Sequence, residues 1–338
     1  MNRKTAALFC AALFSLPAFA SAGNKIIYGV DDRTELYEVP ARFRQAADST
    51  VSLWRKNQIK PDPASGLMQL FTVNYGERYD LCPDVRFREQ PVGANCSGSL
   101  VGEDLVLTAG HCIKSDSDCS AAAIVFGYGI HAAGEKPRTS VASGEVYTCV
   151  KVIKRQLIST SVSVDGGPNI TTSGNDYALI QLDRKVTGHK PLAINRLGNQ
   201  KKGDTLILTG HPDGLPFKFA DNGRIVRPVD PGAAFFDSDL DAFHGNSGSP
   251  VFNAETGLIE GILVRGDSET FMPTFDGCSV YIVNPQNAGR GISINKLTPV
   301  LDVIPPLAEE AAAAAGAAAA VDAARDLEMP ALREVSFN

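Results

Sequence analysis

The chain has 338 residues, of which 44% are hydrophobic, 21% charged and 7% aromatic, with 31 glycines and 20 prolines. This composition is typical of a globular protein rich in turns, and it excludes a collagen, a coiled coil or a disulfide miniprotein. Lysine and arginine total 32 against 38 for aspartate and glutamate, a net charge of -6. A nucleic-acid-binding surface would be basic, so the charge speaks against a nucleic-acid partner.

The first 22 residues have the three parts of a secretory signal peptide. Arg3 and Lys4 form a positive start, residues 6–16 are apolar, and a run of small residues ends at Ala22. Pro17 interrupts the apolar run, which is also too short to span a membrane. We therefore expect export, with cleavage near Ala22 and a secreted or periplasmic protein that has no membrane partner.

Cysteine usage agrees with an oxidising compartment. One cysteine, Cys10, would leave with the signal peptide, and an even number remains. We expect three disulfides, with buried free thiols as the alternative. The six remaining cysteines are Cys82, Cys96, Cys112, Cys119, Cys149 and Cys278.

The middle of the chain consists of short apolar or alternating runs bounded by turn residues. Long stretches of helical periodicity are missing between them, so an all-β fold is favoured over a parallel α/β fold. The predicted strands are residues 105–107, 146–153, 177–182, 205–208, 249–252, 259–264 and 291–294.

The two ends differ from this pattern. Residues 23–66 are charged and could be a removed propeptide or an arm packed on the body. After Pro305 and Pro306, residues 305–338 are dominated by alanine, which favours helix but offers little apolar mass to bury. We expect a short C-terminal helix and a solvated Ala-rich tail, with a surface-attachment or processing segment as the alternative.

Three segments carry candidate chemistry, and the first centres on His111. A predicted hairpin over residues 94–108 leads directly into His111 and Cys112. A disulfide from Cys112 back to Cys96 would hold the histidine rigidly, as a general base requires. Alone, a histidine in a loop is more often structural or solvated.

The second segment is the Gly-rich turn Gly-Asn-Ser-Gly-Ser-Pro at residues 245–250. Small residues around Ser247 would let a substrate carbonyl approach, and the N–H groups of Gly245 and Ser247 could hold an oxyanion. Ser249 stands where an α/β-hydrolase elbow has glycine, so that fold is not indicated. Alone, the segment could be an ordinary glycine turn.

The third segment places Asp176 at the mouth of the predicted strand 177–182. A carboxylate there could orient an imidazole, although aspartate before a strand is usually a turn residue. The chain order is His111, Asp176, Ser247, separated by 65 and 71 residues. Subtilisin-like enzymes and α/β-hydrolases have other orders.

Together, residues 108–112, 176–180 and 245–250 resemble the three signature segments of the chymotrypsin/trypsin-like serine endopeptidases. Gly-Asn-Ser-Gly-Ser-Pro and residues 26–33 are similar to the bacterial glutamyl-endopeptidase-like branch. The resemblance covers residues 67–303. It implies two six-stranded antiparallel β-barrels, residues 67–187 and 188–304, with the active site in the cleft between them.

The resemblance also implies a role for each site residue. A serine nucleophile would be deprotonated by a histidine that an aspartate orients, two backbone N–H groups would form the oxyanion hole, and a strand would pair with the substrate. In this sequence the nucleophile would be Ser247, the general base His111 and the orienting acid Asp176. The oxyanion hole would be formed by Gly245 and Ser247, and the strand that pairs with the substrate would contribute Val264 and Gly266.

Four positions bear on departures from that family and on specificity. Asn246 replaces the aspartate that pairs with a freed N-terminal ammonium in the animal trypsin-like enzymes, so that ion pair is not expected. Leu263 replaces the histidine of the glutamyl endopeptidases, which disfavours a glutamate at P1. Val264 replaces a serine that would hydrogen bond Asp176. Asp241 matches the pocket acid of trypsin-like members, and we expect cleavage after Lys or Arg unless Arg265 neutralises it.

For the four cysteines outside the Cys96–Cys112 pair, three pairings are possible. We favour Cys119 with Cys149, which leaves Cys82 with Cys278.

The sequence thus predicts a secreted, monomeric serine endopeptidase that acts on protein or peptide substrates and needs no cofactor or metal. No Cys-x-x-Cys or His-x-x-x-His spacing occurs. The alternatives are an inactive homologue that binds proteins and a secreted esterase.

Overall fold

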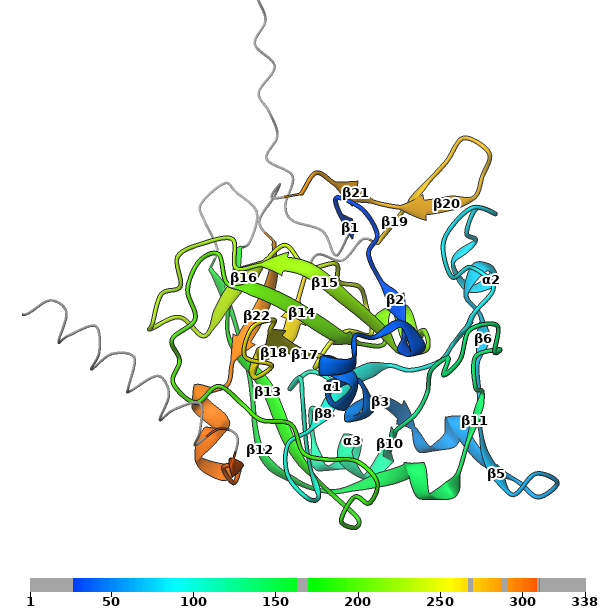
Figure 1. The fold of residues 1–338 in the computed structure, drawn as a ribbon, viewed down its shortest axis with the longest axis horizontal. Coiled ribbons are helices and arrows are strands. Elements are labelled where there is room, and N and C mark those ends of the chain that lie inside the picture. Colours follow the sequence, from blue (N-terminus) through cyan, green and yellow to red (C-terminus); the bar gives the residue numbers. More distant parts are fainter. Residues whose placement is uncertain (1–26, 163–169, 267–269, 287–290, 309, 311–338) are drawn as a thin grey trace, which may run out of the picture.

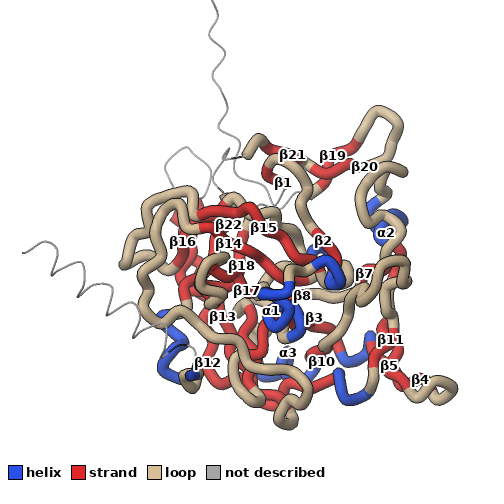
Figure 2. Tube along the Cα trace, in the orientation of Figure 1, coloured by secondary structure: helices blue, strands red, loops and turns tan. Residues whose placement is uncertain are grey.

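The computed structural model describes residues 27–162, 170–266, 270–286, 291–308 and 310. The expected signal peptide and nearly all of the Ala-rich tail lie outside these residues. In the described part the fold is mostly β, with short helices and long connecting loops (Figure 2). None of its helices is long and apolar enough to cross a membrane.

One closed barrel of six antiparallel strands forms the first half of the fold (Figure 1). Residues that face its interior include Val51, Val106, Ile124 and Ile180, each completely buried. Around the barrel the strands follow the order β10 (Ala122–Val125), β12 (Val146–Val162), β13 (Ile170–Leu182), β9 (Leu105–Thr108), β8 (Cys96–Leu100) and β3 (Thr50–Arg55).

The second half is a seven-stranded sheet. Its strands β15 and β16 approach each other at the bridge between Ile225 and Ser238. The sequence predicts a second six-stranded barrel here. The structure has an open sheet of those six strands plus β2, and within the described residues only the one bridge joins its β15 and β16 sides. The order is β16 (Phe235–Ser238), β22 (Ile292–Lys296), β18 (Ile259–Arg265), β17 (Pro250–Asn253), β14 (Thr205–Gly210), β15 (Lys218–Arg224) and β2 (Thr34–Glu35).

The core between the two halves explains why the predicted strands are apolar on both faces. Successive side chains of a strand point to opposite faces. On β9, Val106 faces the barrel interior whereas Leu107 packs in the core shared with the second sheet. On β18, Leu263 belongs to the core of the second sheet and Ile262 to the shared core. The candidate site lies beside this shared core.

All seven strands predicted from the sequence are present. The domain boundary at residue 67 is wrong, because β3 supplies one of the six barrel strands and β2 extends the second sheet. Residues 27–62 therefore supply strands to the fold, with β3 in the barrel and β2 at the edge of the second sheet. The sequence analysis does not single out β3 as a strand, because charged residues surround it and Thr50, Ser52 and Arg55 interrupt its apolar residues.

Smaller elements surround the two halves. Two-stranded pairs are β1 (Ile27–Tyr28) with β21 (Val283–Asn284), β6 (Val73–Asn74) with β7 (Pro91–Val92), and β19 (Phe271–Pro273) with β20 (Ser279–Tyr281). A three-stranded sheet contains β4 (Ile59–Asp62), β5 (Leu67–Leu70) and β11 (Ser140–Val141). The α-helices are α1 (Arg44–Asp48), α2 (Tyr75–Tyr79) and α3 (Asp116–Ala121).

Six 3₁₀ helices complete the described elements: η1 (Leu36–Glu38), η2 (Ala41–Phe43), η3 (Lys56–Gln58), η4 (Ser143–Glu145), η5 (Pro212–Gly214) and η6 (Thr298–Val303). The last of these, η6, precedes Pro305, and the expected C-terminal helix within residues 305–338 falls almost entirely outside the described residues.

Three disulfides connect distant parts of the chain. Cys96–Cys112 links β8 to the loop after β9, Cys119–Cys149 links α3 to β12, and Cys82–Cys278 links the α2 region to the β19–β20 hairpin. These are the pairs that the sequence analysis favours. In Figure 1 the last bridge corresponds to the close approach of α2 and β20 at the edge of the molecule.

Candidate active site

His111 lies in a tight turn that follows β9. The turn is closed by a hydrogen bond from Cys112 N–H to the carbonyl of Ala109, at 3.1 Å, and by the disulfide to Cys96. A Cβ on Gly110 would lie 2.3 Å from the carbonyl oxygen of Gln156, so only glycine fits there. The imidazole is thereby held against strands β12 and β13, with one third of its side chain exposed.

Asp176 on β13 binds this histidine at two points. Its Oδ1 accepts a hydrogen bond from the His111 backbone N–H at 3.0 Å, and its Oδ2 lies 2.8 Å from His111 Nδ1. The Asp176 carboxylate is almost completely buried. Because a carboxylate only accepts, Nδ1 carries the proton and Nε2 is left as the basic nitrogen.

The backbone of Asp176 is held by a residue that the sequence analysis missed. Asp176 N–H donates to Asn295 Oδ1 at 2.7 Å, and Asn295 Nδ2 donates to the carbonyl of Lys296 at 2.6 Å. Asn295 is 1% exposed and lies on β22 of the other sheet. Val264, which replaces the expected serine, has no side-chain donor to offer. A single asparagine in a strand 119 residues away gives no local signal in the sequence.

Ser247 lies in a glycine turn that is held from both sides. Ser97 N–H donates to the Ser247 carbonyl at 2.9 Å, and Ser97 Oγ donates to the Gly245 carbonyl at 2.8 Å. On the other side, Gly248 N–H donates to the Leu263 carbonyl at 2.7 Å. Gly245 and Gly248 have φ of 81° and 85°, in the left-handed region that favours glycine.

Two backbone donors of this turn are available. Among the described residues, the N–H groups of Gly245 and Ser247 have no protein acceptor, so they can hydrogen bond a developing oxyanion. Asn246 N–H is already used, because it donates to the Phe243 carbonyl at 3.2 Å.

The nucleophile turn and the histidine turn are in contact. A Cβ on Gly248 would lie 2.7 Å from Ala109 N, and Cys112 Sγ is 3.7 Å from the Ser247 carbonyl oxygen. Within the described part of the chain, Ser247 Oγ and His111 Nε2 share no direct hydrogen bond. Such contacts are often long without substrate.

A cluster of potential metal ligands near His111 has another explanation. The ligand atoms of Cys96, His111 and Cys112 lie within 4.8 Å of one another. The two sulfurs form a disulfide, however, so neither is available as a thiolate ligand.

The end of β18 offers an edge for an extended peptide. The ladder between β17 and β18 ends at Ile262, whereas β22 pairs with β18 as far as Arg265. Among the described strands, none pairs with residues 264–266 on the β17 side. Val264 and Gly266 therefore lie where a substrate strand could add to the sheet.

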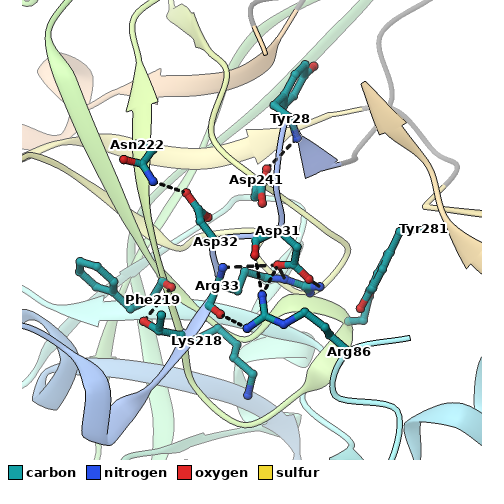
Figure 3. A network of polar contacts seen from close by, with 12 residues as sticks. Tyr28, Asp31, Asp32, Arg33, Arg86, Lys218, Phe219, Asn222, Asp241 and Tyr281 are labelled. Carbon is teal, nitrogen blue, oxygen red and sulfur yellow. Dashed lines mark hydrogen bonds and ion pairs between the residues drawn. The ribbon is translucent and has the colours of Figure 1, made fainter. Parts of the chain in front are cut away.

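Asp241 does not line an open pocket next to Ser247. It is 3% exposed, and its Oδ1 accepts a hydrogen bond from Tyr28 N–H at 2.7 Å (Figure 3). Burial, followed by repulsion from Asp32, raises the pKa of Asp241 to about 8. Burial also raises the pKa of Asp32 to about 6. Arg265, the residue that could neutralise Asp241, donates from Nη2 to the Gly174 carbonyl at 3.1 Å.

Comparison with known proteins identifies the family. Residues 96–262 match the model of the trypsin-like peptidase domain, a span that contains His111, Asp176 and Ser247. The chain belongs to the trypsin-like serine peptidases. No curated protein sequence matches it significantly.

Two solved structures illustrate how distant its structural relatives are. The chain is 15% identical to the VesB protease of Vibrio cholerae, with a TM-score of 0.42 and 81% of the chain covered. It spans 65% of the length of that protein. The chain is 17% identical to a Glu endopeptidase, with a TM-score of 0.42. This match covers 81% of the chain and 94% of the Glu endopeptidase. The family assignment therefore depends on the domain match.

We predict that Asn295→Ala slows the reaction of Ser247 with a fluorophosphonate about tenfold. Losing one buried hydrogen bond of about 1.5 kcal/mol corresponds to roughly that factor. The exposed Asn199→Ala serves as the control and should react at the wild-type rate. Equal rates for the two variants would contradict a role for Asn295 in holding Asp176.

We also predict that the stability of the fold depends on pH through Asp241, and that Asp241→Asn weakens this pH dependence. A carboxyl with a raised folded-state pKa stabilises the fold when protonated, so this stability is lost as pH rises from about 4 to about 8. Asp32, Asp31 and Arg33 also act on this carboxyl. Over that window the melting temperature of Asp241→Asn should fall less than that of the wild type and of the exposed control Asp84→Asn. Parallel curves would contradict the buried, protonated Asp241.

Proposed function

We propose that the protein is an exported serine endopeptidase with the two-barrel, chymotrypsin-like architecture and a His111–Asp176–Ser247 triad. The observation that carries the proposal is the two-point binding of His111 by Asp176 beside a glycine turn with two available N–H groups. The three disulfides support an oxidising compartment.

In the proposed mechanism, Ser247 Oγ attacks the scissile carbonyl carbon while His111 Nε2 takes the hydroxyl proton. Asp176 stabilises the resulting imidazolium through Nδ1–H. The N–H groups of Gly245 and Ser247 hydrogen bond the oxyanion of the tetrahedral intermediate. His111 then gives the proton to the leaving amine, and water hydrolyses the acyl-enzyme by the same steps.

Two cavities flank the proposed reaction centre. One, of about 330 Å³, is lined by His111, Cys112 and Asn95. The other, of about 230 Å³, is lined by Gly245, His244 and Asn95. Both are also lined by Asn95, which directly precedes β8, and together they give a peptide substrate room beside His111 and Gly245.

The preference for Lys or Arg at P1 stays a prediction. The contacts of Asp241 count against it, because its carboxyl group is buried and accepts a hydrogen bond from the Tyr28 amide rather than facing a substrate cation. A protein or peptide substrate is part of the proposal, whereas its P1 residue is left to experiment.

The proposal is tested by incubating the purified protein with a diverse peptide library and identifying the products by mass spectrometry. We expect cleavage by the wild type and by the exposed control Ser120→Ala, and none by Ser247→Ala. Removing the nucleophile of a triad costs on the order of 10⁶ in kcat, which leaves no detectable product. Cuts only after Lys or Arg would confirm the predicted P1 preference.

Other outcomes would contradict the proposal. Cleavage that persists in Ser247→Ala would discard the triad. Hydrolysis of activated esters without peptide cleavage would indicate an esterase, and peptide binding without any hydrolysis would indicate an inactive homologue.

A further inference from the structure

The N-terminal segment 27–35, which we call the strap, contacts the residues that precede Ser247, at Asp241 and Phe243. Its first residues form β1, which pairs with β21, and its last residues form β2, which pairs with β15. Within β1, Tyr28 N–H donates to Asp241, six residues before Ser247 (Figure 3). The strap therefore touches the nucleophile segment directly.

Arg33 is the most unusual residue of the strap. It is 1% exposed, although arginine is rarely buried unless it is paired. Its Nε and Nη2 each donate to the Asp31 carboxylate at 2.8 Å, which makes a bidentate pair. Its Nη1 is buried and has no hydrogen-bond acceptor among the described residues. Burying a guanidinium in this way costs free energy of folding unless other contacts of the cation compensate for the lost hydration.

The charge of Arg33 faces aromatic rings. Its guanidinium carbon lies 3.9 Å from the ring centroid of Phe243, and 4.8 Å and 5.0 Å from those of Tyr281 and Phe87. A desolvated cation over a ring face is a strong contact. Phe243 is completely buried and precedes the oxyanion donor Gly245 by two residues.

Phe243 is also part of the turn itself. Its carbonyl accepts the hydrogen bond from Asn246 N–H, so the position of Phe243 sets the direction of the Gly245 and Ser247 N–H groups. Asn246 stands where an aspartate would otherwise receive a freed N-terminal ammonium. In this chain two groups of the strap lie close to that place instead. They are the Tyr28 amide, which binds Asp241, and the Arg33 guanidinium, which lies over Phe243.

We propose that Arg33 is a positioning residue for the oxyanion hole. Through Phe243 it holds the turn 243–247 in its active arrangement, with no need for a new N-terminal ammonium. This inference rests on the proposed function, because it assigns Arg33 to the turn that would bind the oxyanion.

The test compares Arg33→Met with the wild type on a peptide that the wild type cleaves. We expect kcat to fall about 10²-fold, as when one oxyanion donor is lost, with less than about a threefold change in KM. Affinity for a peptide aldehyde, whose tetrahedral adduct uses the oxyanion hole, should fall in parallel with kcat. A purely structural role would lower the melting temperature without this proportionality.

Arg227→Ala is the matched control. Arg227 is half exposed and pairs with Asp237 on β16 at 3.0 Å, and among the described residues it has no contact with the strap or Phe243. It should keep the wild-type kcat and aldehyde affinity.

Two further measurements keep the proposal falsifiable if Arg33→Met does not fold. Arg33→Lys keeps the charge but loses the bidentate fork and the stacking, so its kcat should also fall. In Arg33→Ala, added guanidinium ion at millimolar concentration should restore part of the lost kcat. Wild-type kcat in Arg33→Lys, or no rescue of a folded Arg33→Ala, would overturn the proposal. An inactive wild type would instead overturn the proposed function.

Discussion

The pairing of Asp176 with His111 is the constraint on which the site depends. It requires β9 and β13 to be neighbours, and their register sets Thr108 opposite Ala178, just before His111 and just after Asp176. The same carboxylate is tied to the second sheet through Asn295. The buried Asp176 thus lies on a barrel strand, contacts the second sheet and sets the tautomer of the imidazole. The site therefore depends on the strand pairing and on the contact between the two halves.

The nucleophile turn is constrained in a comparable way, by elements from both halves. Ser97 of β8 and Leu263 of β18 hydrogen bond it from opposite sides. The strap contacts the turn through Arg33, which lies over Phe243, and the residues before the turn through Tyr28, which binds Asp241. Because these contacts come from distant parts of the chain, the turn keeps its shape only in the folded protein. This preorganisation is what oxyanion stabilisation requires.

Much of this arrangement could be predicted from the sequence, and the reasons for the failures are physical. Strands such as 105–107 are visible because side chains on both of their faces pack in a core, so they form continuous apolar runs. The triad residues stand in distinctive local segments. Residues 50–55 were missed as a barrel strand because the surrounding charges suggested an arm. Asn295 and Arg33 act only through tertiary contacts, and the burial of Asp241 depends on the strap, so spacing in the sequence could not reveal them.

The central claim is that Asp176, through His111, makes Ser247 nucleophilic. The most direct measurement is mass spectrometry of the intact protein and its peptides after treatment with a fluorophosphonate. The account predicts one adduct per chain, located on Ser247, formed rapidly in the wild type and greatly slowed in His111→Ala and Asp176→Asn. A folded wild type that forms no adduct on Ser247, or an adduct that forms equally fast without His111, would contradict it.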